Sequence, residues 1–229
     1  MSRHFTTDER AWHAWIEPVG PETGSAEQIQ AYESSVWPNS PYFRLLAWHP
    51  AALEARTALD HAVFLARTGI RRGERELAAT VASRLNGCEL CASVHARFTV
   101  TFTKREDDVN RLLAEGVDAE LDARWRAITD AAAALTASPP RFGAHHVRAL
   151  LEAGLSASDV QDIVEAAAFF AWANRLMLSF GEPAAPGDED DEALANQRAA
   201  DTAARAEGVS GSDRSLSEPV DRGAAGDHG

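Results

Sequence analysis

The chain has 229 residues, of which 45% are hydrophobic, so it is long enough for one well-packed domain with a tail. Its formal net charge of −13 argues against electrostatic binding to nucleic acid. Two cysteines cannot form the disulfide framework of a small secreted protein, and no uninterrupted apolar run follows the charged first residues. We therefore expect a cytoplasmic protein without a signal peptide.

The first half of the chain begins irregularly and becomes helical. Residues 1–25 are rich in proline and glycine and predict an irregular N-terminal arm. Residues 26–36 predict a short helix, and residues 40–50 a second short helix or turn. The stretch 50–69 starts with proline, stops near a glycine and has helical hydrophobic spacing, so it predicts a longer helix.

The remaining body also has helical periodicity. A helix over 73–87 is expected to break at Asn86-Gly87, because this pair favours a helix end. Further helical segments are predicted over 88–102, 105–116, 118–140, 143–154 and 156–181. Since no stretch alternates like a strand, the prediction is an all-α helical domain over residues 26–182.

The apolar stretch 163–180 is the strongest membrane-span candidate in the sequence. It contains Glu165, Asn174 and Arg175, so a buried core or interface helix is favoured, and no membrane association is expected. Trp172, Asn174 and Arg175 could line a pocket, although such residues on an apolar helix more often pack internally. The excess of hydrophobic surface predicts a homo-oligomer.

The C-terminal stretch 183–229 has a different composition. It carries eleven acidic residues and four arginines, and it has no aromatic residue. Such a segment buries too little apolar surface to offset the entropy lost on ordering, so a disordered acidic tail without a catalytic role is expected.

Both cysteines and a histidine fall within "CELCASVH". Cys88, Cys91 and His95 have the spacing that shares one face of a helix, and Glu76 could face them if the two helices pack as a hairpin. Cys88 would lie near a helix N-terminus, where the macrodipole favours a thiolate. Two thiols, an imidazole and a carboxylate could generate a thiolate and relay protons.

Each of these residues also has an ordinary structural interpretation. Free cysteines are commonly buried, and a lone histidine or glutamate on a helix is usually structural or solvated. A structural zinc site would need Glu76 as its fourth ligand, and covalent haem needs a histidine directly after the second cysteine, where Ala92 stands. A thioredoxin fold needs strands. We therefore expect no metal and no cofactor.

The stretch "ERELAATVASRLNGCELCASVH" resembles the alkyl hydroperoxidase D and carboxymuconolactone decarboxylase superfamily, whose peroxidase branch has a glutamate twelve residues before CxxCxxxH. "SPYFRLLAWHP", "RWRAITDAAAALTASPP" and "AAAFFAWANRLMLSFGEP" are similar to a peroxidase-related subgroup. The resemblance covers roughly residues 5–183. It implies an all-helical homo-oligomer that reduces hydroperoxides through a dithiol–disulfide cycle, with an external thiol or dithiol as reductant.

The resemblance also implies roles for individual residues. Cys91 would react with the peroxide, Cys88 would resolve the product, and Glu76 and His95 would relay protons. The best-known relay of the family has a further histidine between the cysteines, where this chain has Glu89 and Leu90. Two other functions remain open: a carboxymuconolactone decarboxylase-like acid–base enzyme, and a non-catalytic oligomer whose assembly responds to oxidation.

Overall fold

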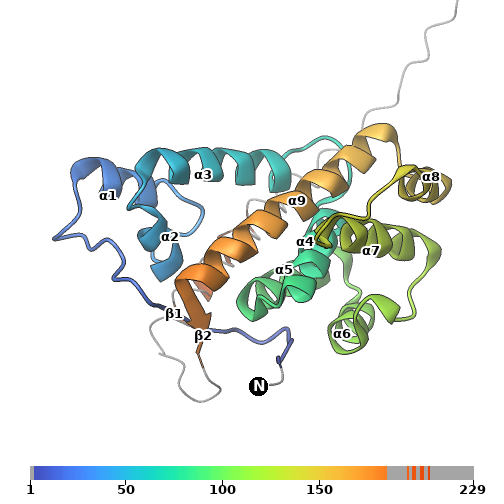
Figure 1. Cartoon of the computed structure of the whole chain (residues 1–229), viewed down its shortest axis with the longest axis horizontal. Coiled ribbons are helices and arrows are strands. Elements are labelled where there is room, and N and C mark those ends of the chain that lie inside the picture. Colours follow the sequence, from blue (N-terminus) through green and yellow to red (C-terminus); the bar gives the residue numbers. More distant parts are fainter. Residues whose placement is uncertain (1–2, 185–194, 196–197, 200–201, 204–205, 207–229) are drawn as a thin grey trace, which may run out of the picture.

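The computed structural model describes residues 3–184, 195, 198–199, 202–203 and 206. Helices dominate this part of the chain, as Figure 1 shows. The helices are α1 (Ala26–Glu33), α2 (Pro41–Leu46), α3 (Pro50–Phe64), α4 (Arg72–Asn86), α5 (Glu89–Thr103), α6 (Glu106–Glu115), the 3₁₀ turn η1 (Gly116–Asp118), α7 (Ala123–Thr136), α8 (Ala144–Glu152) and α9 (Ala157–Phe180). The predicted all-α class is confirmed.

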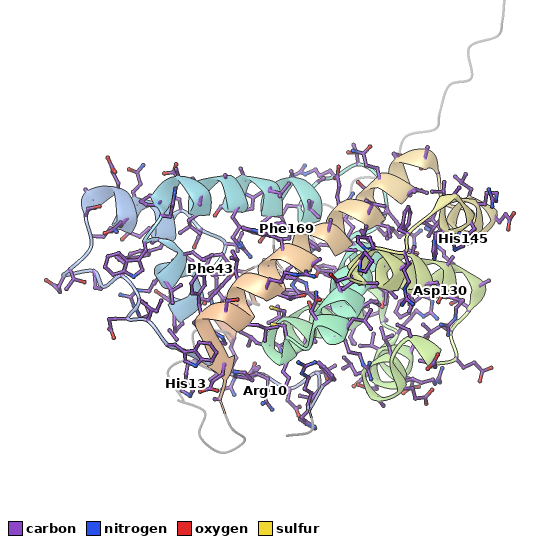
Figure 2. The ribbon with its side chains drawn as sticks, in the orientation of Figure 1. Arg10, His13, Phe43, Asp130, His145 and Phe169 are labelled. Atoms are coloured by element: carbon purple, nitrogen blue, oxygen red, sulfur yellow. The ribbon has the colours of Figure 1, made fainter. Side chains whose placement is uncertain are left out.

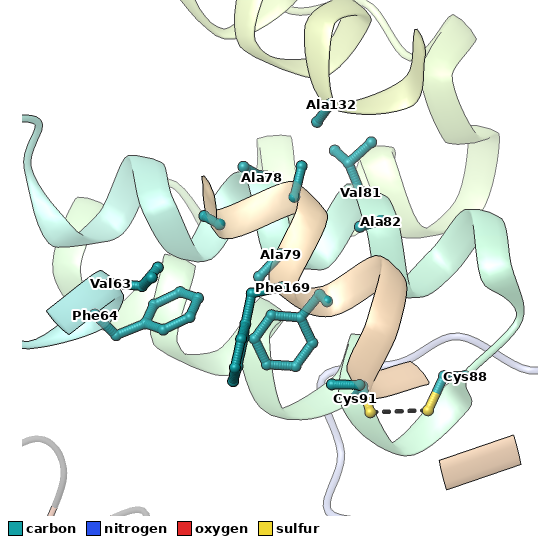
Figure 3. Packing of buried hydrophobic residues seen from close by; sticks show 14 of the residues in the cluster. Val63, Phe64, Ala78, Ala79, Val81, Ala82, Cys88, Cys91, Ala132 and Phe169 are labelled. Atoms are coloured by element: carbon teal, nitrogen blue, oxygen red, sulfur yellow. Dashed lines mark hydrogen bonds between the residues drawn. The ribbon is translucent and has the colours of Figure 1, made fainter. Parts of the chain in front are cut away.

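Helix α4 is the centre of the packing. It contacts α5, α7 and α9, and every residue from Gly73 to Ser83 is buried. Alanines at 78, 79 and 82 are fully buried, and their small side chains allow neighbouring helices to approach closely (Figure 3). An acid or base on this helix is therefore held inside the protein and away from bulk water.

The break between α4 and α5 lies at the predicted position. Gly87 has a φ of 78°, in the left-handed region that glycine adopts at little cost. The Gly87 N–H donates to the Arg84 carbonyl at 3.1 Å, and the Cys88 N–H donates to the Ser83 carbonyl at 2.9 Å. This helix end reverses the chain, so that α4 and α5 form the predicted hairpin.

Two very short strands are the main difference from the sequence-based expectation. Strand β1 (Trp12–Ala14) pairs antiparallel with β2 (Gly181–Pro183), with Trp12 opposite Pro183. A Cβ at Gly181 would lie 2.2 Å from the His13 carbonyl oxygen, so the close approach requires glycine. Three residues are too few to show alternation, which explains why the sequence did not predict strands within the irregular arm.

Helix α9 is long and apolar enough to cross a membrane by length and composition alone. In the structure it crosses the body diagonally, and Ala166, Ala167, Phe170 and Ala173 are buried (Figure 1). Its N-terminus has the predicted cap, in which the Asp159 N–H donates to Ser156 Oγ at 3.2 Å. These features are those of a helix that packs in the core of the fold.

Most of the predicted tail lies outside the described residues. Residues 195, 198–199, 202–203 and 206 are helical, and Arg198 pairs with Glu9 of the N-terminal arm at 2.5 Å.

Candidate active site

The two cysteine sulfurs lie next to each other at the start of α5. The Cys88 thiol donates to Cys91 Sγ at 2.8 Å, and both cysteines are buried and unoxidised (Figure 3). Cys88 is the N-cap of α5, with extended backbone angles, whereas Cys91 is in the first turn. The sulfurs are thus placed so that a small change of side-chain torsion would join them in a disulfide.

The expectation that the helix dipole ionises Cys88 is wrong. The hydrogen bond to Cys91 and burial raise the pKa of the Cys88 thiol well above its ordinary value, while a side-chain contact with Asn174 acts weakly in the opposite direction. Cys88 therefore keeps its proton and donates it toward Cys91. A donor at this distance stabilises negative charge on the Cys91 sulfur.

Glu76 and His95 form the second part of the site. Glu76 Oε2 lies 2.6 Å from His95 Nδ1, which confirms that the α4–α5 hairpin brings these residues together. Only 1% of Glu76 is exposed. A buried carboxylate at this distance fixes the imidazole with its proton on Nδ1, which leaves Nε2 as the basic nitrogen. The pair can therefore accept or deliver a proton at Nε2.

Arg72 is a member of the site that the sequence analysis missed. Its Nε donates to Glu76 Oε1 at 3.0 Å, on the oxygen that His95 does not use. Its guanidinium lies over the rings of Phe98 and Phe102, at 5.4 and 4.5 Å from their centroids. The i, i+4 spacing of arginine and glutamate on a helix was the available sequence signal.

Aromatic rings fix the orientation of the His95 imidazole. The Phe170 ring centroid is 3.9 Å from that of His95, in an edge-on arrangement, and the Phe64 centroid is at 5.6 Å. Met177 of α9 places its sulfur 3.4 Å from Cys91 Sγ. Helix α9 therefore supplies a rigid apolar wall for both cysteine and histidine.

A cavity of about 290 Å³ opens onto Cys91 and His95. Its apolar wall includes Phe64, Leu90, Val94, Phe98, Phe170 and Met177. Its polar and titratable lining includes Tyr42, Arg56, Asp60, His61, Arg72 and Glu76. Ala203, one of the few described residues beyond 184, also borders it. The volume accommodates a small organic molecule beside Cys91.

Arg56 and Tyr42 form another part of the cavity lining. The Arg56 guanidinium pairs with Asp60 at 3.0 Å and stacks against Phe43 at 4.4 Å and Phe169 at 5.2 Å, two rings labelled in Figure 2. Burial raises the pKa of the Tyr42 phenol far above its ordinary value, although Arg56 acts against this effect. This part of the lining therefore combines a fixed cation with a neutral phenol.

The residues between the cysteines do not replace the additional histidine of the family relay. Glu89 Oε2 accepts from Arg10 at 3.1 Å, and Glu89 Oε1 accepts from the His4 N–H at 3.2 Å, so this carboxylate binds the N-terminal arm. Leu90 contributes an apolar side chain to the cavity. Within the described residues, no group of three or more histidine, cysteine, aspartate or glutamate side chains could hold a metal ion.

Of the three α9 residues considered as pocket-lining, Asn174 packs internally. It is fully buried, donates to Ser83 Oγ at 3.1 Å and accepts from Asn86 at 3.1 Å. Arg175 is exposed and donates to the Ala171 carbonyl. Trp172 lines a separate apolar groove rather than the cavity of the cysteines.

Comparisons with known proteins concern the family and the fold of the chain. The model of the carboxymuconolactone decarboxylase family matches residues 50–137, which include α3, α4 and α5. A peroxidase-related protein with an alkylhydroperoxidase AhpD core from Ralstonia eutropha JMP134 is 26% identical, with a TM-score of 0.56 over 67% of this chain and 78% of that one. Residues 50–137 thus match the carboxymuconolactone decarboxylase family, and the chain shares the fold of an alkylhydroperoxidase-related structure. This similarity supports an enzyme of that type, with a peroxidase-related or decarboxylase-like function.

Two other solved structures are similar to this chain. A peroxidase-related protein from Silicibacter sp. TM1040 is 26% identical, with a TM-score of 0.56 over 63% of this chain and 76% of that one. The debrominase Bmp8 is 15% identical, with a TM-score of 0.59 over 86% of this chain and 98% of that one, and it shares the fold. No curated protein sequence matches the chain significantly.

Proposed function

We propose that the protein is a thiol-dependent hydroperoxide reductase that uses Cys91 and Cys88 as a dithiol–disulfide pair. The observation that carries the proposal is the contact of the two sulfurs at 2.8 Å beside a cavity that Glu76 and His95 also line. A decarboxylase-like acid–base enzyme would have no use for the two adjacent thiols. Peroxide reduction uses both, together with a proton donor for the leaving oxygen.

The reaction proceeds in three balanced steps. His95 Nε2 first takes the proton of the Cys91 thiol. The Cys91 thiolate attacks the outer oxygen of ROOH, the O–O bond breaks, and the leaving alkoxide takes this proton back from His95 to give ROH and a sulfenic acid on Cys91. The Cys88 sulfur then attacks the sulfenic acid sulfur, so that water leaves and the disulfide forms. An external thiol or dithiol reduces the disulfide and is itself oxidised.

The geometry supports Cys91 as the attacking sulfur. Cys91 lines the cavity, whereas Cys88 is held behind it and keeps its proton at neutral pH because of its raised pKa. The Cys88 thiol thus acts first as a hydrogen-bond donor to the Cys91 thiolate. It becomes the resolving nucleophile once the negative charge on Cys91 has been removed by oxidation.

The substrate is proposed to be an organic hydroperoxide rather than hydrogen peroxide alone. Apolar side chains form much of the cavity that Cys91 lines, and its volume of about 290 Å³ is larger than hydrogen peroxide needs. Burial of an apolar substrate body stabilises the complex by about 25 cal/mol for each Å² removed from water. Peroxide consumption with a dithiol reductant, measured on alkyl hydroperoxides and hydrogen peroxide, tests this choice.

Mild oxidation by peroxide is expected to remove both free thiols of one chain. The sulfurs already touch, so the second step needs no subunit rearrangement. Intact-mass analysis should show the loss of two hydrogens, and thiol titration should show no remaining free thiols. Retention of both thiols, or crosslinks between subunits only, would contradict a catalytic pair.

The two rival functions give different results in the same assay. Reversible disulfide formation without turnover of any peroxide would favour a redox-sensitive oligomer. Full activity after loss of both cysteines would favour an acid–base enzyme built on Glu76 and His95.

We also propose that the protein is a homo-oligomer. A second groove, of about 470 Å³, is almost entirely apolar and is bordered by Ile16, Trp48, Trp172 and Phe180. Trp48 is 59% exposed and Trp172 is 43% exposed. Exposed aromatic surface of this kind is costly to leave in water.

Light scattering at micromolar concentration is expected to give a mass above that of one chain. Trp172→Glu should lower this mass, because a carboxylate would be desolvated in the contact. Leu151→Glu on α8, an exposed residue outside the groove, is the matched control and should leave the mass unchanged. A stable wild-type monomer would rule out the oligomer.

A further inference from the structure

We propose that Arg72 is a positioning residue of the proton relay: it holds the Glu76 carboxylate against His95, and through Glu76 it sets the tautomer of His95. This inference rests on the proposed function, since it concerns the base that serves Cys91. Arg72 acts through Glu76 and is not assigned a contact with the reacting atoms.

The first step of the argument is the division of the Glu76 carboxylate between two partners. One oxygen accepts from Arg72 Nε at 3.0 Å, and the other lies 2.6 Å from His95 Nδ1. Glu76 is almost completely buried, so solvent cannot stabilise its charge. An uncompensated buried charge is costly, and the adjacent Arg72 guanidinium compensates it.

The second step concerns what a change of protonation would do to His95. An ionised Glu76 accepts the Nδ1 proton and leaves Nε2 without one, as a base requires. Without the cation, the carboxylate is balanced only by a second proton on His95, which then occupies Nε2. Loss of Arg72 would therefore remove the free basic nitrogen of His95.

The third step is that Arg72 is fixed in place. Its side chain is 13% exposed and its guanidinium lies over two aromatic rings, those of Phe98 and Phe102 on α5. These contacts join α4 to α5 on the same side as the Glu76–His95 pair. The cation is therefore part of a rigid arrangement rather than a mobile surface charge.

Other titratable groups border the cavity, and they are common to every variant compared. They come from α2, α3 and α5, and they are Tyr42, Arg56, Asp60, His61 and Cys91. Helix α9 contributes only side chains that do not titrate, namely Phe170, Ala173 and Met177. Because none of them is changed in an Arg72 variant, a difference in titration between variants reports the loss of the Arg72 charge.

The test is a titration of His95 by ¹⁵N imidazole NMR in the full-length reduced protein. In Arg72→Gln, the pH midpoint of His95 protonation is expected to rise by about one unit, since a nearby positive charge is lost. Arg72→Lys should restore most of the wild-type midpoint. Arg72→Met is a second neutral variant that keeps the aliphatic packing on Phe98 and Phe102, in case the glutamine variant does not fold.

Arg71→Gln is the matched control. Arg71 is exposed, is the N-cap of α4 and immediately precedes Arg72. The control variant loses the same charge at the same helix end, and its His95 midpoint should stay within about 0.3 units of wild type, because exposed charges are screened by solvent.

The rate of sulfenate formation at Cys91 is expected to rise with pH on the acidic side of its pH profile. In Arg72→Gln, this rise should move to higher pH by the same amount as the His95 midpoint. An unchanged His95 midpoint in both neutral variants would overturn the inference, as would an equal shift in Arg71→Gln. The NMR titration needs no peroxide. A wild-type protein that reduced no peroxide would therefore reject the proposed function without deciding the role of Arg72.

Discussion

Replacement of Cys91 by serine is expected to abolish peroxide consumption and to leave no sulfenic acid on the protein. A serine hydroxyl is not ionised at neutral pH and cannot take the place of a thiolate as nucleophile. The Cys88 thiol would remain, but its pKa is raised by burial and its sulfur lies behind the cavity wall. The measurement is consumption of an alkyl hydroperoxide together with labelling by a sulfenate-specific probe.

Cys88→Ser is the matched variant, because it removes the neighbouring sulfur by the same chemical change. It should still permit one oxidation, trapped as sulfenic acid on Cys91, and should lose turnover because no disulfide can form. Sulfenate trapped at Cys88 in the Cys91→Ser protein would reverse the two roles while keeping the peroxidase function. Full activity of the double variant would contradict the peroxidase function itself.

The sequence predicts most of the helices because their signals are local. The Gly87 break, the Ser156–Asp159 cap and the proline at the start of α3 all depend on residues within one or two turns. The two strands were missed because each has only three residues and depends on a partner about 170 residues away. Pairing of this kind leaves no periodic pattern in either segment.

The candidate site was only partly predictable, for a similar reason. Cys88, Cys91 and His95 are close in sequence, and a hairpin was enough to add Glu76. Arg72 was missed because an arginine four residues before a glutamate is common on solvated helix faces. Its importance depends on the burial of both residues, which only the packing of α4 at the centre of the bundle determines.

The cavity could not be foreseen at all from local patterns. It is enclosed by α2, α3, α4, α5 and α9, so no single segment contains its signature. The behaviour of Cys88 was wrongly predicted because helix-dipole reasoning considers one helix alone. The adjacent sulfur and the burial of Cys88 outweigh the dipole in the folded protein.

Glu76→Gln and His95→Asn are expected to retain the fold and to slow sulfenate formation at Cys91. A positioned general acid–base contributes on the order of 10²–10⁴-fold to a rate, so a loss in this range is expected from either variant. In Glu76→Gln the amide can still contact His95, but it carries no charge to hold the imidazole in its basic tautomer. In His95→Asn the proton donor for the leaving alkoxide is absent.

Both variants should also raise the pH at which alkylation of Cys91 becomes fast, since the neighbouring base assists formation of the thiolate. Single-turnover oxidation and iodoacetamide labelling across a pH series measure the two effects. The Cys88→Ser background restricts both signals to Cys91.

Glu74→Gln is the control for loss of a buried carboxylate from the same helix. Glu74 is 7% exposed and pairs with Arg124 at 2.5 Å, on a face of α4 that does not border the cavity of the cysteines. Its replacement should lower thermal stability, because the buried side chain loses charge-assisted hydrogen bonds from the partly exposed Arg124. It should leave the rate of Cys91 oxidation nearly unchanged. Equal losses of rate in Glu74→Gln and Glu76→Gln would mean that the carboxylate of Glu76 serves the fold and not the chemistry.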